Sequence, residues 1–298
     1  MRPRGRRPSR LRVALRRIVA FVVLAGFLGV GGWLTAEAVR GDDAPAPQAT
    51  RTRAAAPRPR PLRIIFPEGF TRSQMAQRIR AVNVIARRKR KVTPKLSPRR
   101  YLTATARHSY PSRFGGAGNE RSLEGFLFPA TYDFTRRTTS RQLVARQLEA
   151  FRRNWSKINT RYARSRNLSN YDLLIIASMI EREVRVPRER RLVSAVIYNR
   201  LRDRIPLGID ATLRYGLNIP PTRAIRQSEL DNSTLYNTRI HAGLPPGPIG
   251  NPGLASLRAA AQPARVDFLY FVRNRDCRTH FFTADEDEFY ARVAAPRC

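Results

Sequence analysis

Residues 176–183 read IASMIERE, an apolar helical run that ends by carrying a carboxylate. Glu181 comes four residues after Ala177 and seven after Leu174, so it falls on or beside the apolar stripe of this helix. Glu183 lies two residues further on and points elsewhere. Asn170 can cap the start of the helix. The segment therefore predicts a packed helix whose residues recur at helical spacing: Leu173, Leu174, Ala177 and Ile180.

A glutamate on a packed face is costly to ionise, and its pKa rises when burial removes it from water. A raised pKa lets the group hold a proton near neutral pH, which a general acid needs in order to protonate a leaving oxygen. Glu181 is therefore a candidate general acid. The alternative is a helix-end glutamate that is paired with an arginine in an arginine-rich chain.

The whole composition describes a strongly basic protein with enough apolar residues for a core. The chain has 298 residues, 42% of them hydrophobic, and a formal net charge of +35. This length allows roughly two folded units. Only four of the 57 basic residues are lysines, and the arginines are dispersed rather than interleaved with stacking aromatics. We therefore expect no nucleic-acid partner, although such a surface attracts any anionic polymer.

One segment near the N-terminus has the length and composition of a membrane span. Residues 18–36 contain no charged side chain, and eight arginines precede them within the basic tail at 1–17. Nineteen such residues suit a hydrocarbon layer of ~30 Å. The positive-inside rule predicts a single-pass protein of the cell membrane, with a cytoplasmic N-terminus and an extracytoplasmic remainder. A cleaved signal peptide is the alternative, and it also exports the rest of the chain.

The remainder divides into a linker and two parts with different patterns. Residues 37–61 are rich in Pro, Ala and Arg and predict a semi-stiff spacer. Residues 62–115 predict a small unit with a strand at 62–66, a helix that begins with a Thr71/Gln74 capping box, and a second helix from Pro98. Such a unit can be a carbohydrate-binding module or a spacer without a ligand.

Residues 116–298 predict a larger mixed domain, so the fold class expected is α+β. Aromatic residues in 123–132 suit a cleft wall or a buried strand, and the buried strand is favoured. The loop at 243–253 contains too much proline and glycine for a helix or a central strand. Other elements are expected as helices at 143–151, from Pro187 and at 254–261, a turn-rich segment at 205–212, and strands at 268–272 and 280–282.

Cys277 and Cys298 are the only cysteines. In an exported domain they can pair and fix the C-terminus, or they can remain two independent thiols. The three histidines show no spacing typical of metal ligands, so neither a metal nor a cofactor is expected.

Five motifs, in this order, resemble the MltG/YceG-like endolytic murein transglycosylase family. A LEGYLFPDTY-like segment of the family matches 123–132, and its ASIVEKE-like helix matches ASMIERE at 177–183. The remaining matches are Asn199-Arg200-Leu201 with PLGIDAT at 206–212, Tyr236-Asn237-Thr238 with the loop at 243–253, and a closing pattern at His280, Phe282 and Thr283. The likeness covers roughly 62–293. It implies one membrane anchor, a LysM-like subdomain and a catalytic domain.

The resemblance also implies roles for single residues. Glu181 takes the position of the catalytic acid/base, because it occupies the first glutamate of the helix motif. The residues implied to line the glycan cleft are Glu124, Tyr132, Asn199, Asp210, Asn237 and Thr238. Gly208, Ile209, Ala211 and Ala130 depart from the family pattern.

The activity implied is non-hydrolytic cleavage of the β-1,4 bond between N-acetylmuramic acid and N-acetylglucosamine in nascent strands, with formation of a 1,6-anhydro ring. Neutral donors such as Tyr236, Asn237 and Thr238 would orient the sugar. Asp210 would stabilise positive charge or cap its turn. Cell-wall synthases are the implied partners. The alternatives are a hydrolytic muramidase that uses Glu181 with Asp210 or Glu124, and a catalytically silent wall-binding scaffold.

Overall fold

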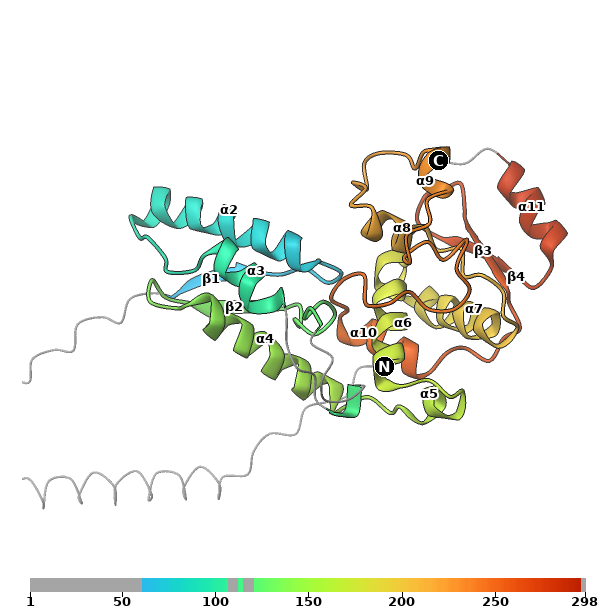
Figure 1. The fold of residues 1–298 in the computed structure, drawn as a ribbon, viewed down its shortest axis with the longest axis horizontal. Coiled ribbons are helices and arrows are strands. Elements are labelled where there is room, and N and C mark those ends of the chain that lie inside the picture. The colour runs from blue at the N-terminus through green and yellow to red at the C-terminus, as the bar shows by residue number, and fades with distance from the viewer. Residues whose placement is uncertain (1–60, 107–111, 115–120, 296–298) are drawn as a thin grey trace, which may run out of the picture. The chain divides into compact units, whose positions relative to one another are not determined.

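The computed structural model describes residues 61–106, 112–114 and 121–295. The predicted anchor at 18–36 and residues 37–60 of the linker lie outside these ranges, as does Cys298, so the Cys277–Cys298 pair stays a prediction. Within the described ranges, no helix has both the length and the apolar character that a bilayer crossing requires. The described chain is a mixed α/β fold (Figure 1).

The N-terminal part of the described chain is built on two antiparallel strands and three helices. Strand β1 (Leu62–Ile65) pairs with β2 (Thr131–Phe134), with Ile64 opposite Tyr132. The Thr71/Gln74 capping box is confirmed and starts α2 (Arg72–Arg90). Helix α3 (Pro98–Ala106) packs on α2 and on α4 (Ser140–Trp155). Strand β2 and helix α4 lie after residue 115, so residues on both sides of the predicted boundary form this layer. The division of the chain at residue 115 stays a prediction.

The C-terminal part is arranged around α6 (Asn170–Glu183), which packs against α7 (Arg190–Arg202) and α10 (Leu254–Ala261). The strands β3 (Tyr270–Arg273) and β4 (His280–Thr283) form an antiparallel hairpin. The shorter elements are η1 (Ser112–Phe114), α5 (Arg161–Ser165), η2 (Pro187–Glu189), α8 (Asp210–Gly216), α9 (Gln227–Leu230) and α11 (Glu286–Ala294).

Helix α6 is the most deeply buried element of this part. Every residue from Leu173 to Ile180 is buried, which contributes on the order of 1.5–3 kcal/mol for each large apolar side chain. The N-cap is Ser169, in a capping box with Asp172, so the expectation that Asn170 caps the helix is wrong by one residue. Ser169 fits the cap because its hydroxyl accepts a hydrogen bond from the backbone N–H of Asp172.

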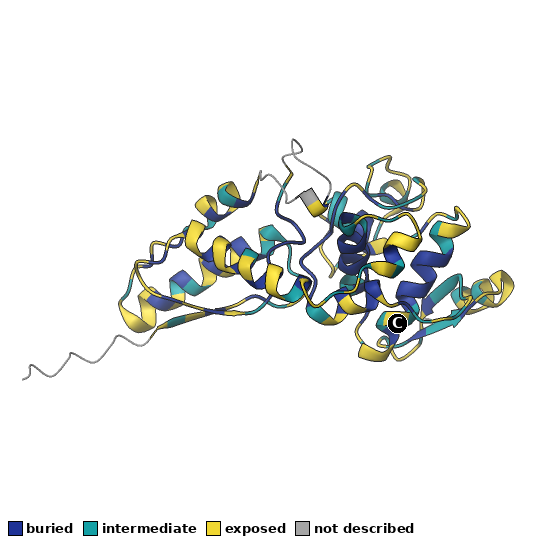
Figure 2. Ribbon diagram, turned by 90° about the horizontal axis from the view of Figure 1, so that it is seen from below, coloured by how far each residue is buried: buried dark blue, intermediate teal, exposed yellow. Residues whose placement is uncertain are grey.

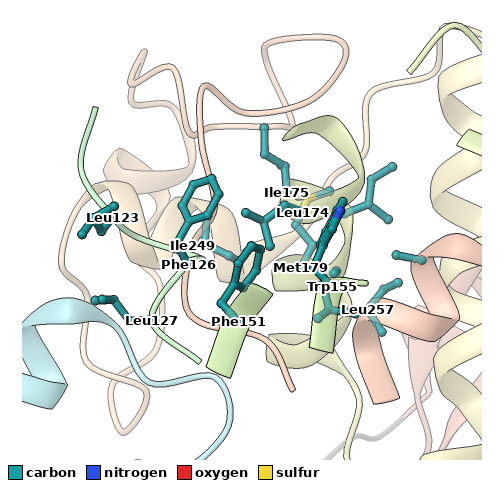
Figure 3. Packing of buried hydrophobic residues seen from close by; sticks show 14 of the residues in the cluster. Leu123, Phe126, Leu127, Phe151, Trp155, Leu174, Ile175, Met179, Ile249 and Leu257 are labelled. Carbon is teal, nitrogen blue, oxygen red and sulfur yellow. The ribbon is translucent and has the colours of Figure 1, made fainter. Parts of the chain in front are cut away.

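The aromatic segment at 123–132 contributes to the core rather than to an open wall, as the favoured interpretation expected. Phe126 packs against Phe114 and Phe151, with ring centroids 5.1 Å away in both pairs. Figure 3 shows Phe126 and Phe151 beside Leu174 and Ile249. Figure 2 shows the buried positions on the inner faces of the helices and the exposed ones on their outer faces.

Candidate active site

A cleft of about 1210 Å³ opens beside the C-terminal end of α6. Its walls come from the end of α6, the loop and first turn of α8, strand β3 and helix α11. Three acidic residues line it, namely Glu183, Asp210 and Glu286. Six arginines also line it: Arg182, Arg185, Arg200, Arg214, Arg239 and Arg273. The cleft is therefore cationic, with a small number of carboxylates placed inside it.

Glu183 is the carboxylate that α6 brings to the cleft. Its Oε1 accepts a weak hydrogen bond from the backbone N–H of Ala211, at 3.4 Å, in the first turn of α8. Burial raises the pKa of Glu183, and the negative charge of Asp210 raises it further. The Ala211 N–H and the charges of His280 and Arg273 act against this shift and lower the pKa. A raised pKa favours the protonated carboxyl group, which is the form that general acid chemistry requires.

Asp210 lies at the start of α8, where the sequence predicted only a turn-rich segment. The N-cap of α8 is Ile209, and the Asp210 carboxylate forms an ion pair with Arg239 across the loop. The negative charge of Asp210 raises the pKa of Glu183, so the two carboxyl groups interact electrostatically. Of the two roles left open for Asp210, this position favours an electrostatic one over capping.

Glu181 has different surroundings from Glu183. Its side chain is 6% exposed and lines neither the cleft nor the second cavity described below. Its Oε2 accepts a hydrogen bond of 2.9 Å from Gly253 N, and its Oε1 lies 3.9 Å from Arg190 Nη2. Burial raises the pKa of Glu68, and the charge of Glu181 raises it further. Glu181 therefore has the arginine partner that the alternative interpretation expected.

Asn237 and Thr238 are buried and hold the cleft loops in place. Thr238 accepts a hydrogen bond of 3.0 Å from Ile209 N at its hydroxyl, and one of 2.9 Å from Gly208 N at its carbonyl. Asn237 donates to the carbonyls of Leu230, the last residue of α9, and of Asn232 just beyond it, at 2.8 Å each. The contacts seen for these side chains are internal, so a direct contact of either residue with glycan stays a prediction.

Three more of the predicted residues are also held by internal contacts. Asn199 donates to the carbonyls of Val266 and Phe268, at 2.9 Å each, and so positions the segment that leads into β3. Tyr132 is 8% exposed and donates to the carbonyl of Phe128. Tyr236 packs its ring against Tyr215, with centroids 5.1 Å apart, and like Asn199 and Tyr132 it does not line the cleft.

Glu124 is 4% exposed and lies at the start of α2 rather than on the cleft. Both of its oxygens lie 3.1 Å from the backbone N–H of Arg72. Asn251 Nδ2 and the Tyr215 hydroxyl also donate to it, at 2.7 and 3.2 Å. Burial raises the pKa of Glu124 to about 7, although these hydrogen bonds oppose the shift. The carboxylate connects the first turn of α2 with the loop at 251 and with α8.

His280 and an aromatic wall were not identified as site features from the sequence. The buried His280 is hydrogen-bonded through Nδ1 to the Glu189 carboxyl, at 2.8 Å. It lines both the cleft and a second cavity of about 730 Å³. Tyr270, Phe289 and Tyr290 line the cleft from β3 and α11. In the sequence, the only feature that points to Glu183 is its position two residues after Glu181 in the same helix motif. In the part of the chain that is described, no cluster of three or more His, Cys, Asp or Glu is arranged to hold a metal.

Comparison with known proteins identifies relatives across most of the described chain. The sequence model of the YceG-like family matches residues 45–295. The endolytic murein transglycosylase of Bacillus subtilis (strain 168) is 35% identical over 150 residues, which are 50% of this chain and 41% of that protein. The endolytic murein transglycosylase of Streptococcus pneumoniae D39 is 31% identical over 196 residues, which are 64% and 35%. The chain thus spans less than half the length of these curated relatives.

A solved structure supports the same relationship at the level of the fold. The crystal structure of a YceG-like protein from Listeria monocytogenes superimposes with a TM-score of 0.64 at 28% sequence identity. The match covers 78% of this chain and 76% of that one.

Proposed function

The chain belongs to the YceG-like family, and on that premise we propose that it is an endolytic murein transglycosylase whose acid/base is Glu183. The substrate would be the β-1,4 bond between N-acetylmuramic acid and N-acetylglucosamine in peptidoglycan strands, as the names of its relatives support. One observation carries the choice of residue: Glu183 lines a cleft of about 1210 Å³ in surroundings that raise its pKa. This choice departs from Glu181, which the motif alone favoured.

The reaction needs one carboxyl group that works twice. Protonated Glu183 donates its proton to the glycosidic oxygen while the bond from C1 of the muramoyl ring to that oxygen breaks. The resulting carboxylate then accepts the proton of the muramoyl 6-hydroxyl, whose oxygen forms the new bond to C1. No water is consumed, and the intramolecular hydroxyl gains its advantage from proximity. The negative charge of Asp210 beside Glu183 favours the positive charge that develops on the ring.

The first half of the reaction uses the raised pKa of Glu183, and the second half uses its hydrogen-bonded carboxylate. The Ala211 N–H faces Glu183 Oε1 and is a donor for the ionised form. Thr238 holds the loop before α8 through Ile209 N, so it contributes by fixing the position of this donor.

The test compares two isosteric variants on purified sacculi. Glu183→Gln keeps the shape but has no acidic proton, so the release of anhydro-muropeptides should fall at least a hundredfold. The matched Glu181→Gln should retain activity within about tenfold of wild type, because the substitution weakens only the contacts of Glu181 with Gly253 N and Arg190. If Glu181→Gln is inactive and Glu183→Gln is not, the acid/base is Glu181, as the helix motif predicts, and the proposed role of Glu183 is contradicted.

The two rival functions have distinct readouts in the same experiment. A hydrolytic muramidase adds a water to each product, which mass spectrometry detects. Glu124 is an unsuitable second acid for that rival, because it is buried at the start of α2, away from the cleft. A silent scaffold would bind strands without releasing any fragments. An anhydro product that disappears with Glu183→Gln contradicts both.

Several features expected from the family remain part of the proposal. We propose a LysM-like subdomain that includes β1, α2, α3 and β2, because β1 and β2 pair with each other. Residues 18–36 would anchor the protein in the cell membrane with the cleft on the outer side. Cell-wall synthases would be partners near the site of strand growth.

A further inference from the structure

Helix α11 (Glu286–Ala294) leaves its aromatic side chains uncovered. None of its residues is buried, although it packs against β3 and β4. Tyr290 is 58% exposed, and Phe289 is partly exposed beside it. A large apolar surface left in contact with water is unfavourable, and patches of this kind mark binding sites.

These rings belong to the same cleft as Glu183. Tyr290 and Phe289 on α11 and Tyr270 on β3 all line it. Figure 1 shows α11 alongside the β3–β4 hairpin. The aromatic surface is therefore continuous with the site at which the proposed reaction takes place.

The three rings support one another from two elements. Tyr270 and Phe289 stack with centroids 5.0 Å apart and planes inclined by 28°. Phe289 meets Tyr290 edge to face at 5.3 Å. The guanidinium of Arg200 lies 4.8 Å from the centre of the Tyr270 ring. Because each ring is held by a neighbour, a ligand that stacks here would lose little side-chain entropy on binding.

The chemistry of the surface fits a pyranose ring. The face of an aromatic ring is electron-rich and attracts the weakly positive C–H groups of an apolar sugar face. Tyrosine hydroxyls at the edge can bond the polar substituents of the same sugar. The sequence placed a stacking wall at 126–132 as one alternative, but Phe126 and Tyr132 are buried there. The most exposed aromatic ring of the cleft is that of Tyr290 on α11.

We propose that Tyr290, supported by Phe289 and Tyr270, forms a sugar-stacking subsite on the α11 wall, which binds a pyranose ring of the strand that is cut beside Glu183. The subsite rests on the proposed function for its ligand. It would increase affinity for the strand without taking part in proton transfer.

The experiment measures binding in the absence of turnover. Glycan strands freed of stem peptides by an amidase are titrated calorimetrically into the full chain carrying Glu183→Gln. Adding Tyr290→Ala should weaken binding about five- to tenfold, whereas Tyr290→Phe should stay within about twofold of the parent because the ring remains. Leu235→Ala is the matched control, since Leu235 is 64% exposed and does not line the cleft.

Each outcome decides the proposal. Equal affinities of the parent and Tyr290→Ala overturn the subsite, and so does a parent that binds no glycan. A loss as large with Leu235→Ala, or with Tyr290→Phe, also overturns it. Anhydro products from the wild-type chain leave the proposed function standing in all of these cases. Conversely, Tyr290-dependent binding without any cleavage by wild type supports the subsite and contradicts the proposed function.

Discussion

Glu181 and Glu183 are two residues apart on one helix and therefore point about 200° apart around its axis. The inner position places Glu181 against Gly253 and Arg190, whereas Glu183 faces the cleft. Helical periodicity identifies the face of α6 that packs against the core, and Glu181 is the glutamate on that face. A cleft lies on a face that the core does not fill, so periodicity alone selects the packed Glu181, whereas the position in the cleft favours Glu183. Which of the two acids is catalytic stays a prediction.

The pH dependence of activity should report on Glu183. Activity requires its protonated form, so kcat should fall as pH rises through the raised pKa of this group. Asp210→Asn removes the charge that raises this pKa, and the fall should then begin at a lower pH. The measurement is the rate of anhydro-muropeptide release across the pH range for both proteins.

Asp231→Asn is the control for that shift, because Asp231 is exposed and does not line the cleft. It changes the net charge equally. A fall that begins at the same pH in wild type and Asp210→Asn would contradict the electrostatic coupling of Asp210 to Glu183.

Glu124 should make stability depend on pH. Its pKa of about 7 in the folded protein lies above the ordinary 4.5, so the folded state binds the proton more tightly. The resulting stabilisation is complete below pH 4.5 and is lost as pH rises to about 7. Between these limits the free energy of unfolding should fall by on the order of 3 kcal/mol through this group. Urea unfolding of wild type and Glu124→Gln at each pH measures it, and parallel pH profiles would contradict it.

At the scale of elements, the loop at 243–253 joins the turn before α2 to the start of α10. Asn251 exchanges backbone hydrogen bonds with Gly69 and Phe70, at 2.8 and 3.0 Å. The Glu68 carboxyl lies so close to Gly253 that a Cβ there would meet its Oε1 at 1.8 Å. Glycine at position 253 has no side chain, so the loop can approach the turn before α2 this closely. The same residues, proline and glycine, exclude a helix or a central strand from this loop.

Gly253→Ala should consequently disturb this junction. The added methyl group would force Glu68 aside and strain the bond from Gly253 N to Glu181, at a cost of about 2 kcal/mol in the free energy of unfolding. In the double variant with Glu68→Ala the obstacle is gone, so the two effects should not add. Urea unfolding of the single and double variants measures the coupling. Additive losses would show that the clash is not the cause.

Elements with local signals could be predicted from the sequence, and those fixed by distant contacts could not. The helix at 254–261 and the Thr71/Gln74 capping box are confirmed because glycine, proline and polar caps act within a few residues. Helix α8 was missed because its loop is held by Thr238, 26 residues beyond Thr212. Helix α11 was missed because it buries no residue and so carries no clear apolar stripe.

The same limit applies to the site. Of the residues that the motifs selected, Asp210 lines the cleft. Glu124, Asn199, Asn237 and Thr238 are polar residues with special positions, but their hydrogen bonds are internal, and a motif does not distinguish a ligand contact from a buried support.

At the scale of the whole molecule, the chain carries a net charge of +35. The cleft shares this excess of positive charge, because six arginines and three carboxylates line it. Strands that carry carboxylates should therefore bind with a strong dependence on salt. Raising salt from about 0.1 M to about 1 M shortens the screening length from about 10 Å to about 3 Å and should raise KM for sacculus strands several-fold. Affinity for neutral N-acetylglucosamine oligosaccharides should barely change.

Arg273→Gln identifies the part of this effect that comes from the cleft. Arg273 has no ion pair among the described residues, and its charge reaches Glu183. Its loss should raise KM at low salt, flatten the salt dependence and raise the pKa of Glu183. The matched control is Arg137→Gln, which removes an exposed charge that does not line the cleft. If both variants flatten the dependence equally, the attraction belongs to the whole basic surface, and the arginines of the cleft have no special share in it.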